Sequence, residues 1–426
     1  MTTFLVFVAT ILLLVGVHEL GHFLAAKLLR VGVLEFAIGF GPAIWAKKRG
    51  KTRYSLRLFP LGGYVRLAGE GPEIGEYAPE ETYYGRPAWV RFLVGLSGPA
   101  FNLALAFVLA WGAFLFIGLP RLRVAGLVPG KPAEEVLRVG DVLLAVEGKE
   151  VWNLGEVGER IQAKAPDPVR FRIVRDNEEM EVSILPVYSE EEGRYLVGGY
   201  FQPQVVLAEI QDLKPLSPLS AAGLRPGDVI VSACDKPVRS FREWYALLTE
   251  GCRSLTVRRG DQILALELPE LPSGLASLFE GAEFRSLPMV YGQIGFPRAT
   301  ALAAQQVGMA FSVIVETFKA MARREIPAGE AVSGPVGIAG IISAGITAGP
   351  LVVLLLIAVI SVNLALFNLL PIPGLDGARM LFALFEMATG RRVSPRVETL
   401  VHTLGFILLL GLLVLITARD ILRLFG

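Results

Sequence analysis

Two histidines and a glutamate stand close together near the N-terminus, within the apolar segment GVHELGHFLAAKL at residues 16–28. His18 and His22 are four residues apart, so on a helix both imidazoles point the same way and can bind one ion. Glu19 lies beside that face, where it can hold and deprotonate a water molecule. The chain has only three histidines, and an ionised group at bilayer depth costs about 2.5 kcal/mol or more. The pattern therefore predicts a zinc site of the HExxH type rather than a chance match.

A catalytic zinc site takes a third protein ligand and keeps one position open. The best candidate is Asp376 in NLALFNLLPIPGLDGARM, because Pro371 and Pro373 break an apolar helix just before it. His18 lies roughly 21 Å below the start of the first apolar stretch, at 1.5 Å per residue. If both stretches cross the membrane in the same direction, Asp376 reaches a similar depth. An ordinary loop carboxylate is the alternative for Asp376. The third histidine, His402, opens the last apolar stretch and is expected to be an interfacial residue rather than a ligand.

The composition is that of a membrane protein. Of the 426 residues, 53% are hydrophobic, and the mean hydropathy is +0.53, both above the values of ordinary soluble proteins. The 41 basic and 40 acidic residues nearly balance, so no nucleic acid partner is expected. The first three residues supply no basic region and no small-residue cleavage site follows, so the first apolar run is expected to remain as an anchor. Four stretches approach the length of about 20 residues that spans a bilayer, the last only with its flanks: 4–29, 92–119, 351–370 and 404–417.

Basic residues in short loops set the expected orientation. The loop after the first stretch and the loop before the last are expected to be cytoplasmic, because they carry Arg30, Lys47, Lys48, Arg49, Lys51, Arg53 and Arg57, and Arg379, Arg391, Arg392 and Arg396, respectively. The N-terminus and the long region 119–350 then lie outside, and in this region acidic residues outnumber basic ones by 29 to 24. Cys234 and Cys252 would meet an oxidising compartment there and be able to pair. We expect them instead to be separate small core residues, because nothing in the sequence fixes their distance.

The exported region contains two similar segments. LRVGDVLLAVEGKEV at 137–151 and LRPGDVIVSACDKPV at 224–238 share a Gly-Asp pair, a β-rich run and a turn. Each precedes a helix-like stretch and another strand, and the offset of 87 residues indicates an internal duplication. SPLSAAGLRPGDVI resembles a PDZ domain closely, and the first copy does so more loosely. Such domains bind extended peptide ends by strand addition. The alternative is that they only form a steric cover over the site.

HELGH in a first span and NLLPIPGLDG after a third resemble the site-2 protease family of intramembrane zinc metalloproteases, most of all its bacterial regulator-of-sigma-E protease type. The likeness covers nearly the whole chain, through FAIGFGPAIW, FPLGGYVRL, GPAFN (98–102) and SGPVGIA (333–339). It implies that His18, His22 and Asp376 bind zinc and that Glu19 is the general base. The family often continues LDGGH where this chain has LDGARM, which leaves the ligand unchanged but removes the Gly-His that follows it.

The same resemblance implies how a substrate is held. In the family, the asparagine of the NxxPxPxLDG stretch, here Asn368, helps to hold the substrate strand. Residues 53–67, RYSLRLFPLGGYVRL, have the pattern of strands with a turn at Gly62-Gly63, and in the family such a segment dips into the membrane as a β-hairpin beside the zinc. Gly62 and Gly63 are therefore expected to contact the substrate. A peptide bond inside a helix is shielded, so a membrane substrate must become extended, and strand addition to an exposed edge achieves this. From the residues alone, a simple cytoplasmic hairpin is equally compatible.

These observations predict a polytopic α-helical membrane protein with about four transmembrane helices, a membrane-associated β-hairpin and two exported PDZ-like α+β domains. The linker after the second PDZ-like domain is expected to contain an amphipathic helix on or near the membrane surface, because residues 300–324 have apolar positions at helical spacing. The expected segments are 1–118, the first two transmembrane helices with HExxH and the hairpin loop; 119–190 and 191–272, the PDZ-like domains; 273–345, the exported linker; and 346–426, the last two transmembrane helices with the LDG motif.

The expected function is zinc-dependent cleavage of the transmembrane segment of a single-pass membrane protein, in a bacterial inner membrane. An anti-sigma factor already trimmed outside is an example, and the trimming is implied by the resemblance alone. A catalytically inactive PDZ-bearing membrane scaffold is the alternative from another class, and the intact His18, Glu19, His22 and Asp376 argue against it. A metal transporter would need polar residues along several spans, and these spans are largely bare.

The charge pattern makes a topological prediction. A reporter fused near Val187 should be exported, and one fused near Arg392 should be cytoplasmic, because the basic loops remain inside. Activities of periplasmic and cytoplasmic reporter enzymes at the two positions measure this. The opposite pattern would place His18 at the wrong end of its span relative to Asp376.

Overall fold

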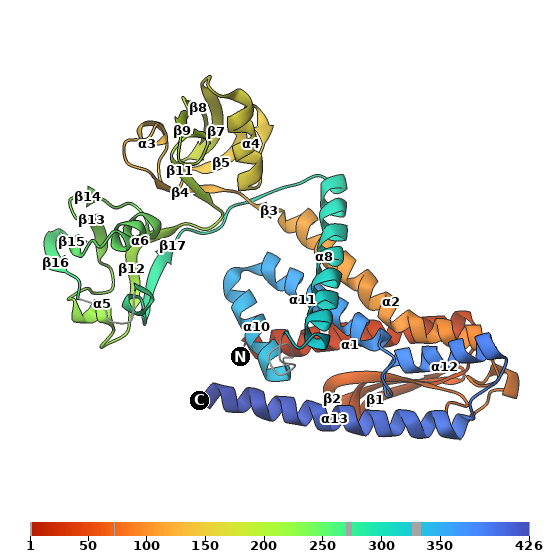
Figure 1. Cartoon of the computed structure of the whole chain (residues 1–426). Coiled ribbons are helices and arrows are strands. Elements are labelled where there is room, and N and C mark those ends of the chain that lie inside the picture. Colours follow the sequence, from red (N-terminus) through yellow and green to blue (C-terminus); the bar gives the residue numbers. More distant parts are fainter. Residues whose placement is uncertain (1, 72, 270–274, 326–333, 426) are drawn as a thin grey trace. The chain divides into compact units, whose positions relative to one another are not determined.

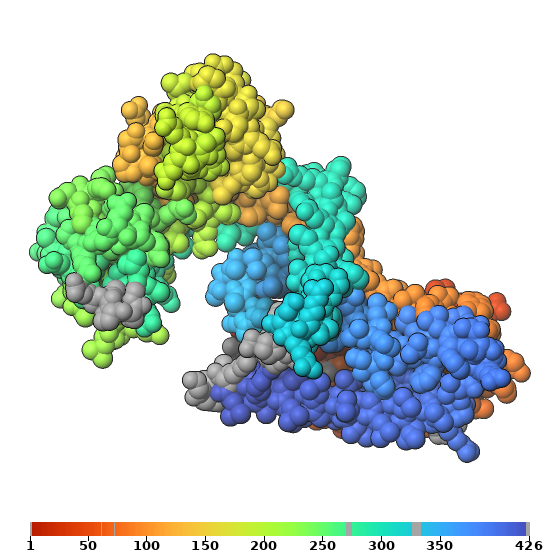
Figure 2. Space-filling model, in the orientation of Figure 1, coloured from red at the N-terminus to blue at the C-terminus, as the bar shows by residue number. Residues whose placement is uncertain are grey.

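The computed structural model describes residues 2–71, 73–269, 275–325 and 334–425, and Figure 1 shows the course of the chain. The chain forms two compact units, Met1–Ile117 with Gln293–Gly426, and Gly118–Gly292. The first unit is built from both ends of the chain, which appear in red to orange and in teal to blue in Figure 2. The second unit is an insertion between them. The expected boundary between residues 272 and 273 lies outside the described residues.

The first unit contains the apolar helices. They are α1 (Thr2–Leu28), α2 (Ala88–Gly112), α8 (Phe296–Ala322), α10 (Pro335–Ala348), α11 (Pro350–Leu369), α12 (Asp376–Thr389) and α13 (Pro395–Phe425), with short turns η1 (Pro79–Glu81) and η2 (Ala113–Ile117). Within the described ranges, five helices are long and apolar enough to cross a membrane: Thr2–Leu28, Ala88–Ile117, Phe296–Ala322, Pro350–Leu369 and Pro395–Leu422. The chain is a multi-pass membrane protein, as predicted.

Four of these helices match the predicted spans, and the fifth is α8. The sequence predicted an amphipathic helix here, on or near the membrane surface, whereas the length and composition of α8 also suit a span. Phe296 at its start packs on Trp111 of α2, with 5.6 Å between ring centroids, and Phe318 near its end packs on Phe367 of α11 at 5.2 Å. Apolar residues such as the exposed Phe311 extend beyond this packed face. The described residues thus contain five helices that suit a span, where about four transmembrane helices and an additional amphipathic helix were predicted.

Small residues let α1 and α2 approach closely. A Cβ atom on Gly21 of α1 would lie 2.5 Å from the Ser97 carbonyl oxygen of α2, so only glycine fits at this crossing. Ser361 of α11 donates a hydrogen bond to the Asn102 carbonyl oxygen of α2 at 2.8 Å. Helix α2 is thus fixed against both the helix that carries HExxH and the helix that leads to Asp376.

The sheet of the first unit is folded back on itself. β1 (Val33–Arg49) and β2 (Thr52–Leu67) are joined by a tight turn. Ile38 of β1 is paired with both Leu56 and Gly63 of β2, so the first part of β1 lies between the two ends of β2. Four segments therefore lie side by side, in the order 45–49, 52–56, 33–38 and 63–67.

The predicted strand–turn–strand pattern of residues 53–67 is present, but the turn lies earlier than expected. The chain reverses over residues 57–62, and Gly63 already belongs to the last segment of the sheet. A Cβ atom on Gly63 would lie 2.8 Å from the Ala37 carbonyl oxygen and 3.3 Å from Glu19 Cγ. Glycine stands here because the chain passes close to the Ala37 carbonyl group of β1 and also lies against α1.

The second unit contains two sheets. The first has the order β11-β4-β5-β7-β8, with β6 paired to β5, and the second has the order β16-β15-β13-β12-β17, with β14 paired to β13. The first sheet and its helices are β4 (Arg123–Leu127), β5 (Val142–Val146), β6 (Lys149–Glu150), β7 (Val169–Arg175), β8 (Glu178–Ile184), β11 (Gly199–Gln202), α3 (Ala133–Val136) and α4 (Leu154–Lys164). The second are β12 (Val206–Leu213), β13 (Val229–Ala233), β14 (Lys236–Pro237), β15 (Ser254–Arg259), β16 (Gln262–Glu267), β17 (Ala282–Ser286), α5 (Pro218–Ala221), α6 (Phe241–Thr249) and α7 (Leu275–Leu278). Two short ladders pair β9 (Val187–Ser189) with β10 (Arg194–Leu196), and β3 (Leu119–Pro120) with β18 (Tyr291–Gly292).

The two sheets repeat the same order of elements and the same buried ion pair. Asp141 of the first Gly-Asp pair accepts from Arg175 at 2.9 Å, and Asp228 of the second accepts from Arg259 at 2.8 Å. The internal duplication predicted from the sequence is therefore present in the structure. β11 follows the expected domain boundary at residue 190 but pairs with β4 of the first sheet.

Cys234 and Cys252 form a disulfide, with their Cα atoms 5.8 Å apart. The prediction of two separate core residues is wrong. β13 and β15 are neighbours in the second sheet, and the Cys234 N–H donates to the Ser254 carbonyl oxygen at 3.0 Å. Strand pairing thus fixes the distance that the sequence leaves open.

The repeated ion pair predicts where each domain is vulnerable. Asp228 is fully buried, and 27% of the Arg259 side chain is exposed. Asp228→Ala should therefore lower the free energy of unfolding of the second domain by about 2–3 kcal/mol. This loss lies at or below the range observed when a fully buried ion pair is broken. Hydrogen–deuterium exchange on the full-length protein should show faster exchange in β13 and β15 and no change in β5 and β7. Asp141→Ala should give the reverse pattern, and a uniform change in both domains would contradict the account.

Candidate metal centre

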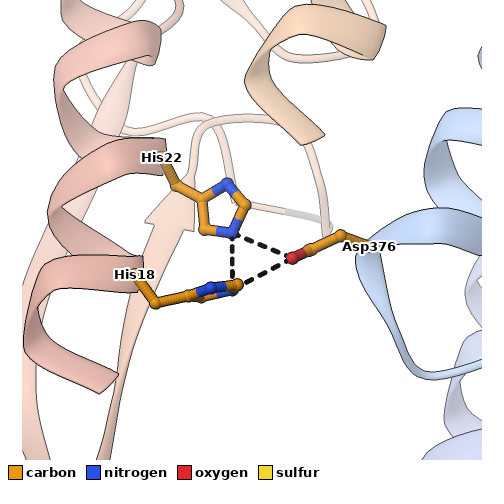
Figure 3. Close-up of side chains that lie close together, drawn as sticks. All are labelled: His18, His22 and Asp376. Carbon is orange, nitrogen blue, oxygen red and sulfur yellow. Dashed lines mark hydrogen bonds and ion pairs between the residues drawn. The ribbon is translucent and has the colours of Figure 1, made fainter. Parts of the chain in front are cut away.

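Figure 3 shows three side chains that meet between α1 and the start of α12. Nε2 of His18 and Nε2 of His22 lie 3.0 and 3.2 Å from Oδ2 of Asp376, and the two nitrogens are 3.1 Å apart. Both histidines are buried. The structure thus brings together the three residues that the sequence predicted as ligands.

The spacing of these donor atoms fits a zinc ion. Ligand atoms at about 2.0–2.1 Å from a tetrahedral zinc are about 3.3 Å from one another, close to the separations observed here. Two imidazoles and one carboxylate are also a common donor set for catalytic zinc. These residues can therefore hold the metal that the sequence implied.

The chain around Asp376 explains how it reaches the histidines. After α11 the chain passes through Pro371 and Pro373, and Asp376 is the first residue of α12. The connecting loop packs tightly on α13, because a Cβ atom on Gly405 would lie 2.1 Å from the Pro373 carbonyl oxygen. The carboxylate is therefore held at a helix start by a rigid loop, where the orientation of the backbone N–H groups favours a negative charge.

Both imidazoles are oriented by α2. Nδ1 of His22 lies 2.7 Å from the Val94 carbonyl oxygen, so Nδ1 carries the proton and Nε2 keeps its lone pair for a metal. Nδ1 of His18 lies 3.2 Å from the amide nitrogen of Asn102. The Asn102 side-chain oxygen is buried and has no hydrogen-bond partner among the described residues. Turning this amide by 180° places the oxygen where it accepts from the His18 Nδ1–H, and the His18 Nε2 is then also free for a metal.

Asn102 is a functional residue that the sequence analysis did not single out. It is fully buried and stands in the GPAFN motif of a mostly apolar helix. A single amide side chain at bilayer depth is the sequence signal that could have identified Asn102, because an unpaired polar group there is costly.

Gly98 of the same motif lies directly against the imidazoles. A Cβ atom on Gly98 would lie 2.4 Å from His22 Nε2 and 2.8 Å from His18 Cε1. No side chain fits at this position while the rings remain in place. The motif therefore supplies both the space for the two histidines and the orienting amide.

A cavity of about 240 Å³ contains the three ligands together with Glu19, Asn368 and Arg379. Gly63 lies against Glu19, as described above, so the sheet borders this cavity. Gly62 points elsewhere, since a Cβ atom there would lie 2.3 Å from the Phe40 ring. Of the predicted substrate-binding residues, the structure thus brings Asn368 and Gly63 to the site and leaves Gly62 beside Phe40.

Two further residues clarify the surroundings of the site. His402 lies outside the ligand cluster, and its Nδ1 is 3.2 Å from the Gly374 N–H, from which it accepts. Arg379, in the LDGARM stretch, forms an ion pair with Glu70. Burial lowers the pKa of Arg379, but Glu70, Tyr83, Asp376 and Tyr84 together outweigh burial and raise the pKa above its ordinary value. A charged guanidinium therefore stands in the wall of the cavity.

The close contact at Gly98 predicts a selective loss of metal. Gly98→Ala should weaken zinc binding by at least about tenfold, because the added methyl displaces both imidazoles. Gly112→Ala on the same helix is the control, since its Cβ atom would meet only Phe116 at 3.9 Å. Competition with a zinc chelator measures both affinities, and equal affinities would contradict the assignment.

Comparison with known proteins agrees with this site. The model of the family described as Peptidase family M50 matches residues 6–412. A Thermotoga maritima protein named "Putative zinc metalloprotease" is 31% identical over 514 residues, covering 99% of this chain and all of that protein. The regulator of sigma-E protease RseP of Escherichia coli is 30% identical over 463 residues, covering 98% of each chain. A crystal structure of the PDZ domain of the SdrC-like protein Lin2157 from Listeria innocua covers 19% of this chain and 93% of that domain, with 22% identity and a TM-score of 0.18. The chain therefore belongs to peptidase family M50, the site-2 protease family of zinc metalloproteases.

Proposed function

We propose that this protein cleaves the transmembrane segment of a single-pass membrane protein whose outer part has already been trimmed, such as an anti-sigma factor. The observation that carries the proposal is the meeting of His18, His22 and Asp376 in one cavity with Glu19. Helix α1, which carries His18, Glu19 and His22, suits a bilayer, so the peptide bond that reaches these residues is one that lies within the membrane.

The chemistry follows from the residues in the cavity. His18, His22 and Asp376 would hold a zinc ion, which would supply Lewis-acid polarisation of the scissile carbonyl group and of a bound water molecule. Glu19 accepts a proton from the attacking water on its carboxylate and passes it to the leaving amine. Arg379 and Glu70, paired with each other, stand in the wall of the same cavity.

The sheet offers a way to present the substrate. Segment 63–67 is one edge of the four segments, and its first residue, Gly63, lies against Glu19. A substrate that adds as a strand to this edge exposes its peptide bonds beside the general base. Asn368 lines the same cavity and is suited to bind the backbone of that strand.

The proposed location is a bacterial inner membrane, with the second unit outside the cytoplasm. The disulfide between Cys234 and Cys252 supports an oxidising compartment for that unit. The basic loops after α1 and before α13 support a cytoplasmic location for the C-terminal end of α1 and the N-terminal end of α13. A substrate would then meet the two PDZ-like domains on the outer side.

Two variants separate the base from the ligands. Glu19→Gln should retain zinc but lose cleavage by roughly 100-fold or more, because an amide cannot accept the proton. Asp376→Asn should lose both zinc and cleavage, because a neutral amide is a poorer ligand for a hard dication. Zinc content and cleavage of a transmembrane substrate in proteoliposomes measure this. Substantial proteolysis by Glu19→Gln would exclude Glu19 as the base, and full zinc occupancy with activity in Asp376→Asn would exclude the ligand set.

A further inference from the structure

One face of the sheet carries an ordered pattern of side chains away from the metal cavity. In a β-sheet, residues directly opposite one another on neighbouring strands share a face. Trp45 is opposite Leu56, which is opposite Ile38, and this row is apolar. The next row has Lys47 opposite Tyr54, which is opposite Phe36. The face thus changes from apolar to cationic along the strands.

These rows line a groove of about 560 Å³, within the range of about 300–1,000 Å³ that is usual for small-molecule sites. Phe36 and Tyr54 at one side pack on Phe23 of α1, with ring centroids 5.1 and 5.9 Å apart. Trp45 remains 54% exposed and Leu56 46% exposed. The groove therefore offers apolar surface that the described residues leave uncovered.

The charges at the end of the groove are all positive. Lys47 and Arg49 line it, and no acidic residue does. Their neighbours Lys48 and Lys51 are neutralised by Glu76 at 2.7 Å and Glu81 at 3.2 Å, respectively. Among the described residues, Lys47 and Arg49 have no ion-pair partner. The chain therefore pairs the cations around this turn but leaves the two in the groove available to an external anion.

The cationic and apolar parts of the groove also lie at the depths expected for the headgroup and the acyl chains of a lipid. Arg49 is paired with Thr52 at the turn between the strands, and Thr52 accepts from Lys27, in the last turn of α1, at 2.6 Å. This end of the sheet is thus level with the end of the apolar helix, where headgroups lie. Trp45 and Leu56 lie further along the strands, in the direction of the acyl chains, and tryptophan with flanking basic residues is typical of this boundary.

We propose that the groove binds one anionic phospholipid. Its floor is apolar, two unpaired cations lie at its end, and the cations and the apolar floor lie at different depths along the strands. An acyl chain lies over Ile38, Trp45 and Leu56, and the phosphate is bound by Lys47 and Arg49, whose guanidinium suits bidentate contact with phosphate oxygens. The lipid fills the face of the sheet beside segment 45–49, the edge opposite to the one next to Glu19.

Quenching of Trp45 fluorescence tests this in the full-length protein, reconstituted in phosphatidylcholine nanodiscs. A small fraction of lipid brominated on its acyl chain is added, either as phosphatidylglycerol or as phosphatidylcholine, and a Trp45→Phe variant isolates the signal of this tryptophan. We expect the brominated phosphatidylglycerol to quench at roughly tenfold lower mole fraction. The Lys47→Gln/Arg49→Gln double variant should abolish this preference.

Lys48→Gln/Lys51→Gln is the matched control, because it removes two cations around the same turn that the protein already neutralises. It should leave the preference intact, and an equal loss in both double variants would overturn the proposal in favour of diffuse charge attraction. If the groove instead binds the substrate, the two brominated lipids should quench Trp45 fluorescence equally. The emission of Trp45 should then change only when a transmembrane substrate peptide is added. That outcome would also overturn the proposal. Because the measurement requires no proteolysis, it is independent of the proposed function.

Discussion

The convergence of two imidazoles and one carboxylate within a membrane is the constraint on which the rest of the first unit depends. Charged and polar groups at bilayer depth are costly unless each is paired and fixed. Helix α1 supplies both imidazoles by its spacing, but it fixes neither ring. Helix α2 fixes them, through the Val94 carbonyl, the Asn102 amide and the space left at Gly98. The close crossing at Gly21 exists because α2 must reach the rings.

The same constraint explains the sheet. An unpaired backbone N–H or C=O group is costly in lipid. An extended segment near the site must therefore form hydrogen bonds with neighbouring strands along most of its length. Folding β1 and β2 back on themselves pairs the inner segments 52–56 and 33–38 on both sides. Two edges remain, and they differ. Gly63 brings one edge against Glu19, where we propose that a substrate strand adds. The other edge carries Lys47 and Arg49, and the groove beside it suits a lipid.

Local signals in the sequence predicted much of the site. His18 and His22 follow from helical spacing, and Asp376 follows from the two prolines that end the preceding helix and from the direction of the spans. The roles of Gly98 and Asn102 did not follow, because they depend on how two helices cross. The Cys234–Cys252 disulfide was missed for the same reason, since the pairing of β13 with β15 alone sets that distance. Helix α8 was predicted as an amphipathic helix. Its suitability as a membrane span was not predicted, because it depends on apolar residues outside the face that packs on α2 and α11.

X-ray absorption at the zinc edge of the purified, full-length protein tests the central claim most directly. Two imidazole nitrogens and one or two oxygens should surround zinc at about 2.0–2.1 Å, with the multiple-scattering signature of two imidazole rings and without sulfur. A spectrum with sulfur ligands, with a single imidazole, or with six oxygens would contradict the convergence of His18, His22 and Asp376 on one metal ion.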